Sequence, residues 1–304
     1  MTQRSFRFGL QVFNAESRSG WQEQARQAEQ AGFDTILVPD HVLGGVFPPI
    51  VALDAMASAT SRLRVGTFVL NNDFRHPAFV ARDAATLDLL TDGRFELGVG
   101  AGHAQPEYAE LGLTFDSAER RVDRLEEAVG ILRDLFDGHT VTVDGTHYQL
   151  RDHRLFPERR PILLVGGNGD RVLRLAATQA DIVGFTGLGR TRADGQQHDM
   201  EWAIDQIDAK VALVRAAAGD RLDLLELNVL VQQIEITEDR RTVAEEAARR
   251  VGGDPEVMLD APYMLVGTVE EIVEQIQSAR KRWGFTYFVT RSMEPTARII
   301  AAIG

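Results

Sequence analysis

Two histidines stand where this 304-residue chain could carry out proton chemistry. His41 follows the short apolar run 35–38 after Pro39 and Asp40, and His103 follows the run 95–100 after Ala101 and Gly102. A histidine has an ordinary pKa of about 6.5 and can donate or accept a proton near neutral pH. His41 is thus a candidate acid/base, but it could also simply cap a strand end. His103 is either a substrate contact or a surface loop residue.

Small and polar residues follow the other apolar runs. Asn14, Asn71 and Thr186 each stand after such a run, and Gly166-Gly167-Asn168-Gly169 leads from one run into an amphipathic stretch beginning at Asp170. A glycine-rich turn before a helix leaves backbone N–H groups available to an anion. The same turn could also be only a tight connection. It has neither dinucleotide-binding spacing nor the Lys-Ser/Thr of a P-loop.

Metal and nucleophilic chemistry gain no support from the sequence. The chain has no cysteine, and its seven histidines do not cluster at the spacing of metal ligands. No serine sits in a nucleophile elbow, and Asp40 and His41 point to opposite faces if the chain there is extended. Asp40 therefore need not contact His41, and its other possible role is to hold its loop in place. We expect no metal site.

The elements that must position these residues alternate in a βα rhythm. Eight short apolar runs read as strands buried on both faces, as in a parallel sheet. They are 6–13, 35–38, 63–70, 95–100, 161–165, 181–185, 225–231 and 287–290. The helix patterns between them are 21–31, 53–60, 78–90, 116–136, 170–179, 200–218 and 269–283, several of which are followed by a glycine.

Eight strands with intervening helices favour a (β/α)₈ TIM barrel over a doubly wound sheet, which usually reaches that strand number only with a second domain. We predict a single barrel domain over residues 1–304. Two insertions interrupt the rhythm, at about 138–160, where Asp144-Gly145 indicates a hairpin, and at about 237–262, which is helical and charged. In such a barrel, reactive groups lie where strands end.

Composition narrows the class of protein. The chain has 45 acidic and 33 basic residues and a formal charge of −12, which argues against nucleic-acid binding. No apolar run approaches the roughly 20 residues that span a bilayer, and the N-terminus does not resemble a signal peptide. We expect a globular cytoplasmic protein that acts on a small molecule and binds neither nucleic acid nor membrane.

Several segments together resemble the luciferase-like monooxygenase superfamily, and within it the coenzyme F420-dependent oxidoreductases. The carriers of the resemblance are 22–33 leading to 38–41, 63–67 with 74–77, 84–88 followed by 92–95, 97–102 and 164–167. The resemblance implies a barrel that holds a flavin-type ring at its C-terminal mouth, and it implies frequent dimers, so a homodimer is expected.

The resemblance also implies roles for individual residues. Asp40 and His41 match the acidic-histidine pair beside the reactive edge of the ring, with His41 as the acid/base. Phe68-Val69 falls where the family has a non-prolyl cis peptide behind the ring, and Asn71 could bond the polar edge of the ring. The segment Gly100-Ala101-Gly102 would pass close to the ring, while Gly166, Gly167 and Asn168, with Thr186, would hold phosphate. Asn14 and His103 are the candidate substrate contacts.

The resemblance implies hydride transfer between the deazaflavin of coenzyme F420 and a small organic substrate. An FMN-dependent monooxygenase and a non-catalytic flavin-binding barrel are the alternatives. Sugar-phosphate dehydrogenases of the group have a glutamate at the position of His103 and a tryptophan near Gly44 or Gly45, so that substrate is not supported. The coenzyme tail needs a basic rim, for which the candidates are Arg154, Arg159, Arg160 and Arg171.

Overall fold

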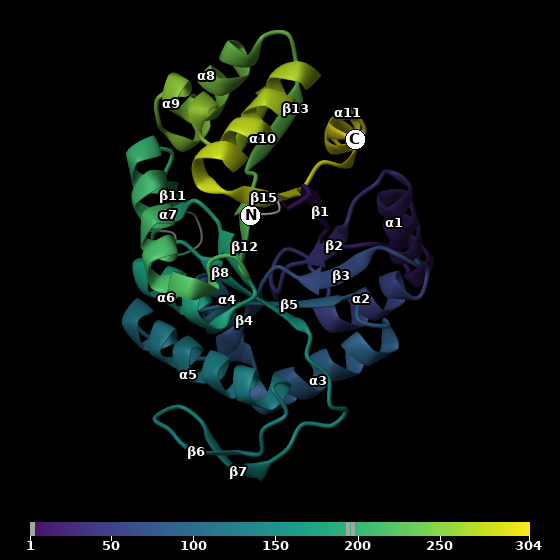
Figure 1. Cartoon of the computed structure of the whole chain (residues 1–304), viewed down its shortest axis with the longest axis vertical. Helices are drawn as coiled ribbons and strands as arrows, with labels where there is room; N and C mark the ends of the chain where they lie inside the picture. The colour runs from purple at the N-terminus through teal and green to yellow at the C-terminus, as the bar shows by residue number, and fades with distance from the viewer. Residues whose placement is uncertain (1–3, 193–194, 196–197) are drawn as a thin grey trace.

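Eight parallel strands close into a barrel in the computed structural model, which describes residues 4–192, 195 and 198–304 (Figure 1). The strands run in the order β3-β2-β1-β15-β12-β9-β8-β5, and pairing of β3 with β5 closes the circle. They are β1 (Arg7–Gln11), β2 (Thr35–Val38), β3 (Arg64–Thr67), β5 (Phe95–Gly100), β8 (Ile162–Gly167), β9 (Ile182–Phe185), β12 (Glu226–Leu230) and β15 (Phe285–Thr290). The predicted (β/α)₈ barrel is confirmed.

The strands form because their side chains are buried on both faces of the sheet. On β15, Phe288 packs outward with the helices, whereas Tyr287 and Val289 belong to a second apolar cluster inside the barrel. The predicted third strand is interrupted: after β3 the chain leaves the sheet at Phe68 and rejoins it as the short β4 (Leu70–Asn71), which pairs with β5.

Helices cover the outside of the barrel. All seven predicted helices are present: α1 (Arg18–Gln30), α2 (Pro49–Ala57), α3 (Pro77–Leu90), α5 (Ala118–Phe136), α6 (Asp170–Gln179), α7 (Ile204–Ala218) and α10 (Val269–Trp283). The predicted start of α7 at Met200 was wrong, because residues 198–200 form β11 (His198–Met200) and pair with β10 (Leu188–Thr191). Sequence reasoning missed α4 (Gln105–Glu110), α11 (Met293–Ile303) and the short 3₁₀ helices η1 (Asn72–Phe74) and η2 (Gly219–Arg221).

Two segments lie outside the barrel sheet, where insertions were predicted. One forms an antiparallel hairpin of β6 (Val141–Asp144) and β7 (Gln149–His153), which projects beneath α3 and α5 in the view of Figure 1. The other carries α8 (Arg240–Val251) and α9 (Pro255–Asp260), between β13 (Gln233–Ile236) and β14 (Met264–Gly267), which pair in parallel. That the whole chain is one domain remains a prediction. Within the described residues, no helix combines the length and apolarity needed to cross a bilayer.

Charged side chains close the barrel at the amino ends of its strands. Arg7 of β1 pairs with Glu96 of β5 and, at 2.5 Å, with Glu226 of β12, while Arg64 of β3 reaches Glu96 at 2.7 Å. Burial disfavours the charge on Arg7, but Glu96, Tyr287 and Glu226 together raise the pKa of its guanidinium. In such barrels the reactive groups lie at the opposite end, at the carboxyl termini of the strands.

Candidate active site

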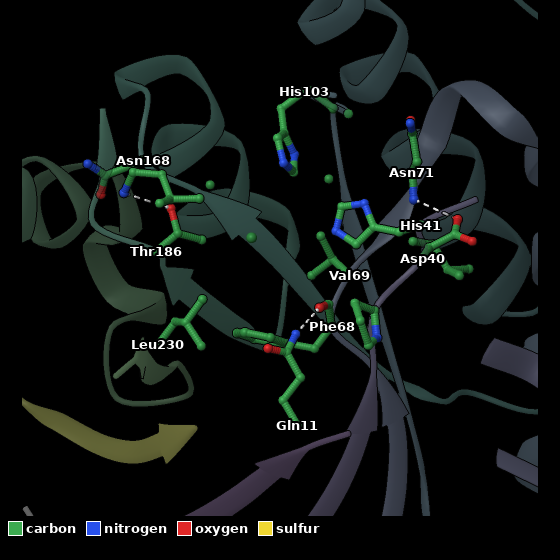
Figure 2. A pocket seen from close by; sticks show the side chains of 18 of the residues that line it. Gln11, Asp40, His41, Phe68, Val69, Asn71, His103, Asn168, Thr186 and Leu230 are labelled. Atoms are coloured by element: carbon green, nitrogen blue, oxygen red, sulfur yellow. Dashed lines mark hydrogen bonds between the residues drawn. The ribbon is translucent and has the colours of Figure 1, made fainter. Parts of the chain in front are cut away.

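A cavity of about 300 Å³ opens at the carboxyl end of the barrel (Figure 2). Every predicted site residue except Asn14 contributes to its wall. The lining residues are Gln11, Phe13, Pro39, Asp40, His41, Phe68, Val69, Leu70, Asn71, Gly100, Ala101, Gly102, His103, Glu107, Gly166, Gly167, Asn168, Val172, Thr186, Leu188, His198, Leu230 and Arg291. The structure thus brings together residues from all eight barrel strands or the loops that follow them.

Asn14 lies outside this cavity. Its side chain is exposed, its carbonyl oxygen accepts a hydrogen bond from Gln24 Nε2 at 3.0 Å, and it borders a separate surface depression beside α1. The reason is that β1 ends at Gln11, earlier than predicted, and the chain then turns outward. The placement of Asn14 at the substrate pocket is therefore corrected, and Gln11 and Phe13 supply the wall of the cavity on this side.

His41 is held by a carboxylate that the sequence did not point to. Its Nδ1 lies 2.8 Å from Oε1 of Glu107, a buried residue of α4. A carboxylate accepts hydrogen bonds, so Nδ1 of His41 is assigned the proton and donates a hydrogen bond to Oε1 of Glu107. The other ring nitrogen, Nε2, is then the atom of His41 that can exchange a proton with a ligand, because the His41 side chain remains partly open to the cavity.

Two further imidazoles extend from His41 along the mouth. The rings of His41 and His103 meet edge to face with centroids 5.6 Å apart, and His103 meets His198 of β11 at 4.8 Å. Burial, assisted by His198 and His41, lowers the pKa of His103 to about 4. His103 is therefore neutral at physiological pH and offers a ligand a neutral imidazole.

Asp40 supports a loop. It is buried, and its carboxylate forms an ion pair with both terminal nitrogens of Arg75, Nη2 lying 3.0 Å from Oδ1. Its Oδ2 also accepts the backbone N–H of Asn71 at 3.0 Å, so Asp40 ties the end of β2 to the end of β4 (Figure 2). Although Asp40 borders the cavity, both of its oxygens are engaged by the protein.

The peptide bond between Phe68 and Val69 is cis, which confirms that prediction. The carbonyl oxygen of Phe68 accepts a hydrogen bond from Gln11 Nε2 at 3.0 Å (Figure 2). Val69 packs over two glycines: a Cβ on Gly100 would lie 2.8 Å from its side chain, and one on Gly166 would lie 3.0 Å away. These glycines therefore make room for Val69 as well as lining the cavity.

Gly102 is required by its neighbours. It has a φ of +74°, and a Cβ there would lie 2.2 Å from the hydroxyl oxygen of Tyr108 and 2.4 Å from Oδ1 of Asn71. The Tyr108 hydroxyl donates to Asn71 Oδ1 or Asp73 Oδ2, at 3.2 and 3.0 Å. Asn71 Oδ1 also accepts the backbone N–H of Asp73, which leaves the amide nitrogen of Asn71 to serve a ligand.

The glycine loop leads into α6 as predicted. Its cap residue, Gly169, offers no side chain to the first N–H groups of the helix, and these groups attract anions. Asn168 Nδ2 donates to Glu201 at 2.5 Å, and Lys210 pairs with Glu201 at 2.7 Å. This orientation leaves Oδ1 of the buried Asn168 without a partner among the described residues.

The expected basic rim is not formed by the predicted arginines, none of which lines the cavity. Arg159 pairs with Asp88, Arg160 with Asp137 and Asp181, Arg171 with Asp123 and Glu126, and Arg154 with Glu158. Within the described ranges, Arg291 is the one arginine or lysine of the cavity wall. The prediction of those four arginines was wrong because charge alone does not say which way a side chain points.

Sequence reasoning also missed other residues of the wall. Glu107 belongs to the undetected helix α4, although Pro106 and the acidic Glu107 in its first turn are typical of a helix start. His198 follows a segment read as a connection, and Arg291 directly follows the last predicted strand. The strand-end rule that selected His41 would have selected Arg291 if it had been applied to the eighth strand.

Comparison with known families identifies the family of the chain. Residues 7–252 match the family described as luciferase-like monooxygenase. The chain belongs to this family. A curated relative from Beutenbergia cavernae, named F420-dependent glucose-6-phosphate dehydrogenase, is 34% identical over 234 residues, which cover 74% of the chain and 66% of the relative. One from Microbacterium testaceum with the same name is 37% identical over 163 residues, covering 51% of the chain and 48% of the relative.

The part of this luciferase-like chain that matches therefore spans about half to two thirds of the length of these curated relatives. Solved structures share its fold over nearly the whole length. An F420-dependent secondary alcohol dehydrogenase in complex with an F420-acetone adduct gives a TM-score of 0.76 at 22% identity, covering 99% of the chain and all of that protein. The long-chain alkane monooxygenase LadA gives 0.73 at 16%, covering 100% and 90%. At these identities the likeness concerns the fold alone.

Proposed function

We propose that this luciferase-like protein is a coenzyme F420-dependent oxidoreductase that transfers a hydride between the deazaflavin and a small organic substrate. The observation that carries the proposal is the Glu107-held imidazole of His41 at the wall of a cavity backed by the cis Phe68–Val69 peptide. The names of the two curated relatives described above, both F420-dependent glucose-6-phosphate dehydrogenases, support the choice of coenzyme.

The described residues fit a tricyclic ring with a phosphorylated tail. Val69 and the glycines beneath it offer an apolar platform, and the Asn71 amide offers a donor at its edge. On the opposite side of the cavity stand Asn168, whose buried Oδ1 lacks a partner among the described residues, and the amino end of α6, which favours phosphate (Figure 2). These residues would hold the coenzyme, which supplies two-electron hydride chemistry at ring carbon five.

The protein contributes position and a proton. His41 would give a proton from Nε2 as a C=C, C=O or C=N bond of the substrate gains hydride, or accept one there as the reduced compound loses hydride, while Glu107 fixes the ring through Nδ1. His103 is neutral at physiological pH, so it serves as a hydrogen-bonding partner for the substrate, and His41 is the residue that exchanges the proton.

An FMN-dependent monooxygenase is the second candidate, because LadA shares the fold at nearly the same TM-score as the F420-dependent alcohol dehydrogenase. The two rings have nearly the same shape, so the cavity alone accommodates either. A non-catalytic flavin-binding barrel is the third. Glucose 6-phosphate itself is disfavoured, because Gly44, Gly45 and His103 replace the tryptophan and glutamate expected for that substrate.

Binding titrations of the purified protein with F420 and with FMN test the proposal first. We expect F420 to bind at micromolar concentration or tighter and FMN more weakly. His41→Ala should retain F420 affinity and lower turnover of enones, ketones or imines by about 10²-fold or more, the loss expected for a general acid. Tight binding of FMN alone would support the monooxygenase, and unchanged turnover in the variant would remove His41 from this role. A homodimer and a cytoplasmic location also remain predictions.

A further inference from the structure

Arg291 brings a positive charge to the wall of the cavity. It directly follows β15, the eighth strand of the barrel, and precedes α11. Its side chain is exposed and lines the cavity. Neither the predicted coenzyme site nor the acid/base role of His41 uses this residue.

Neutral amides alone hold the guanidinium in place. Nε donates to Gln11 Oε1 at 2.9 Å, and Nη1 donates to Gln232 Oε1 at 3.2 Å. Because a guanidinium only donates, both amide oxygens must face Arg291. The amide nitrogens then donate outward, Gln11 to the Phe68 carbonyl at 3.0 Å and Gln232 to the Thr186 carbonyl at 3.1 Å. Arg291 is thereby fixed in position, while Nη2 makes no hydrogen bond to the described part of the chain.

The charge on Arg291 is not compensated. No carboxylate of the described residues lies within ion-pair distance of it, and burial lowers the pKa of its guanidinium with no carboxylate acting to raise it. The two carboxylates of the cavity wall are already engaged, Asp40 by Arg75 and Glu107 by His41. An arginine stays protonated at physiological pH even so, and a guanidinium fixed at the cavity wall is a binding site for an anion.

Arg291 lies apart from the place expected for the coenzyme phosphate. The glycine loop that would hold the phosphate follows β8, and two strands, β9 and β12, stand between β8 and β15. Arg291 instead neighbours Gln11 of β1, on the side of the cavity that holds the Phe68 carbonyl. One cavity therefore offers two separate positions for negative charge.

We propose that Arg291 binds an anionic group of the organic substrate, in the first instance a carboxylate, through Nη2. The inference rests on the proposed function, because it assigns the substrate class of the same cavity. It predicts that the enzyme prefers keto or unsaturated acids to the corresponding neutral compounds.

A matched pair of ketones tests the preference. Laevulinate (4-oxopentanoate) and 2-pentanone have the same five-carbon chain and the carbonyl in the same position, and they differ in the carboxylate. Their binding to wild-type protein loaded with oxidised F420 is followed by the change in F420 fluorescence, which requires no turnover. We expect laevulinate to bind about ten- to a hundredfold more tightly, the gain of one charge-assisted hydrogen bond.

Two variants separate charge from support. Arg291→Gln should abolish the preference for laevulinate and leave the dissociation constant of F420 within about twofold of the wild-type value. A twofold change is smaller than the contribution of one hydrogen bond. Arg291→Lys keeps the charge but not the planar fork that holds both amides, so it should retain part of the preference. If Lys and Gln lose it equally, Arg291 acts only by holding Gln11, and the proposal fails.

Other outcomes also overturn the proposal. The proposal fails if laevulinate binds wild-type protein no more tightly than 2-pentanone. It also fails if the Arg291→Gln variant keeps the preference for laevulinate. If the affinities of F420 and of laevulinate fall in parallel in this variant, the anionic group that Arg291 binds belongs to the coenzyme. If wild-type protein binds no F420, the proposed function fails, and calorimetric titration of both ketones against the coenzyme-free protein then tests Arg291 independently.

Discussion

At the scale of single residues, the arrangement of His41 depends on Glu107. The carboxylate lies 2.8 Å from Nδ1, is almost fully buried and comes from a helix 66 residues further along the chain. A carboxylate in that position both selects the tautomer of the imidazole and stabilises its cation when a proton arrives. Glu107 is in this sense a positioning residue, because it acts through His41.

Glu107→Gln tests that role. The amide keeps the shape of the side chain but lacks the charge, so it should lower kcat by about tenfold or more, in line with losses seen when an orienting partner is removed. KM and the dissociation constant of F420 should change little, and Glu107→Asp should restore part of kcat. Steady-state kinetics with fluorescence titration of F420 measure these quantities. A fall in F420 affinity that matches the fall in kcat would show that Glu107 only supports the cavity.

The sequence predicted the residues that stand at strand ends and missed those that arrive from elsewhere. His41, His103 and Asn168 follow apolar runs, so the geometry of a barrel alone places them at the mouth. Glu107 sits on a six-residue helix, too short to show periodicity. Its contact with His41 joins distant parts of the chain, and such pairing cannot be read from local pattern.

At the scale of elements, the segment from the end of β4 through η1 is held by Asp40. This carboxylate joins the end of β2 to Arg75 and to the backbone of Asn71, on either side of η1. The same segment carries the contacts of Asn71 and Asp73 with Tyr108 of α4. A wall of the cavity therefore depends on one ion pair between two loops.

Asp40→Asn should lower the free energy of unfolding of the coenzyme-free protein by about 2 kcal/mol or more, because Arg75 loses its partner in a largely buried place. Arg75→Met should behave similarly, and the double variant should fall short of the sum by about 1 kcal/mol or more. Denaturant titrations of the four proteins give the coupling. If Asp40 instead contacts only the coenzyme, Asp40→Asn will leave the coenzyme-free protein unchanged and weaken F420 alone.

Elements whose apolar residues recur at a clear helical spacing were predicted well. Elements that form only by pairing with another segment of the chain were not. The bounds of α6 and α10 agree with the prediction to the residue, because α6 begins directly after the glycine loop and α10 lies between the Thr268 capping box and Gly284. In contrast, β11 is polar and exists only because β10 pairs with it, so its residues were taken for the start of α7. The break at Phe68 likewise depends on Val69 fitting over glycines of neighbouring strands.

At the scale of the whole molecule, closure of the barrel was predictable because eight buried strands in one chain leave few other arrangements. The charged layer at its amino end was not, because Arg7, Glu96 and Glu226 come from strands distant in sequence. Tyr287 joins them from β15 through a 3.3 Å hydrogen bond to Glu96. This layer links strands around the barrel, so it should affect the unfolding of the entire molecule.

Arg7→Met leaves the buried Glu226 without its ion-pair partner and Glu96 with Arg64 alone, and it should lower the free energy of unfolding by about 3–5 kcal/mol at pH 7.5. Burial already raises the pKa of Glu226 above its ordinary value of 4.5, and loss of Arg7 removes an opposing effect. A carboxyl with a raised pKa in the folded state stabilises the fold below pH 4.5 and loses that contribution as the pH rises through the folded-state value. The deficit of the variant should therefore shrink between pH 7.5 and 5.

Denaturant titrations followed by circular dichroism and tryptophan fluorescence measure this difference, and both signals should shift together if the layer supports the entire barrel. Arg171→Met is the matched control, because Arg171 also bridges two carboxylates, Asp123 and Glu126, but on the open surface. It should cause no measurable change, since exposed ion pairs contribute little. An Arg7→Met deficit as small as that of the control, or one that grows toward pH 5, would show that closure of the barrel does not depend on this charge.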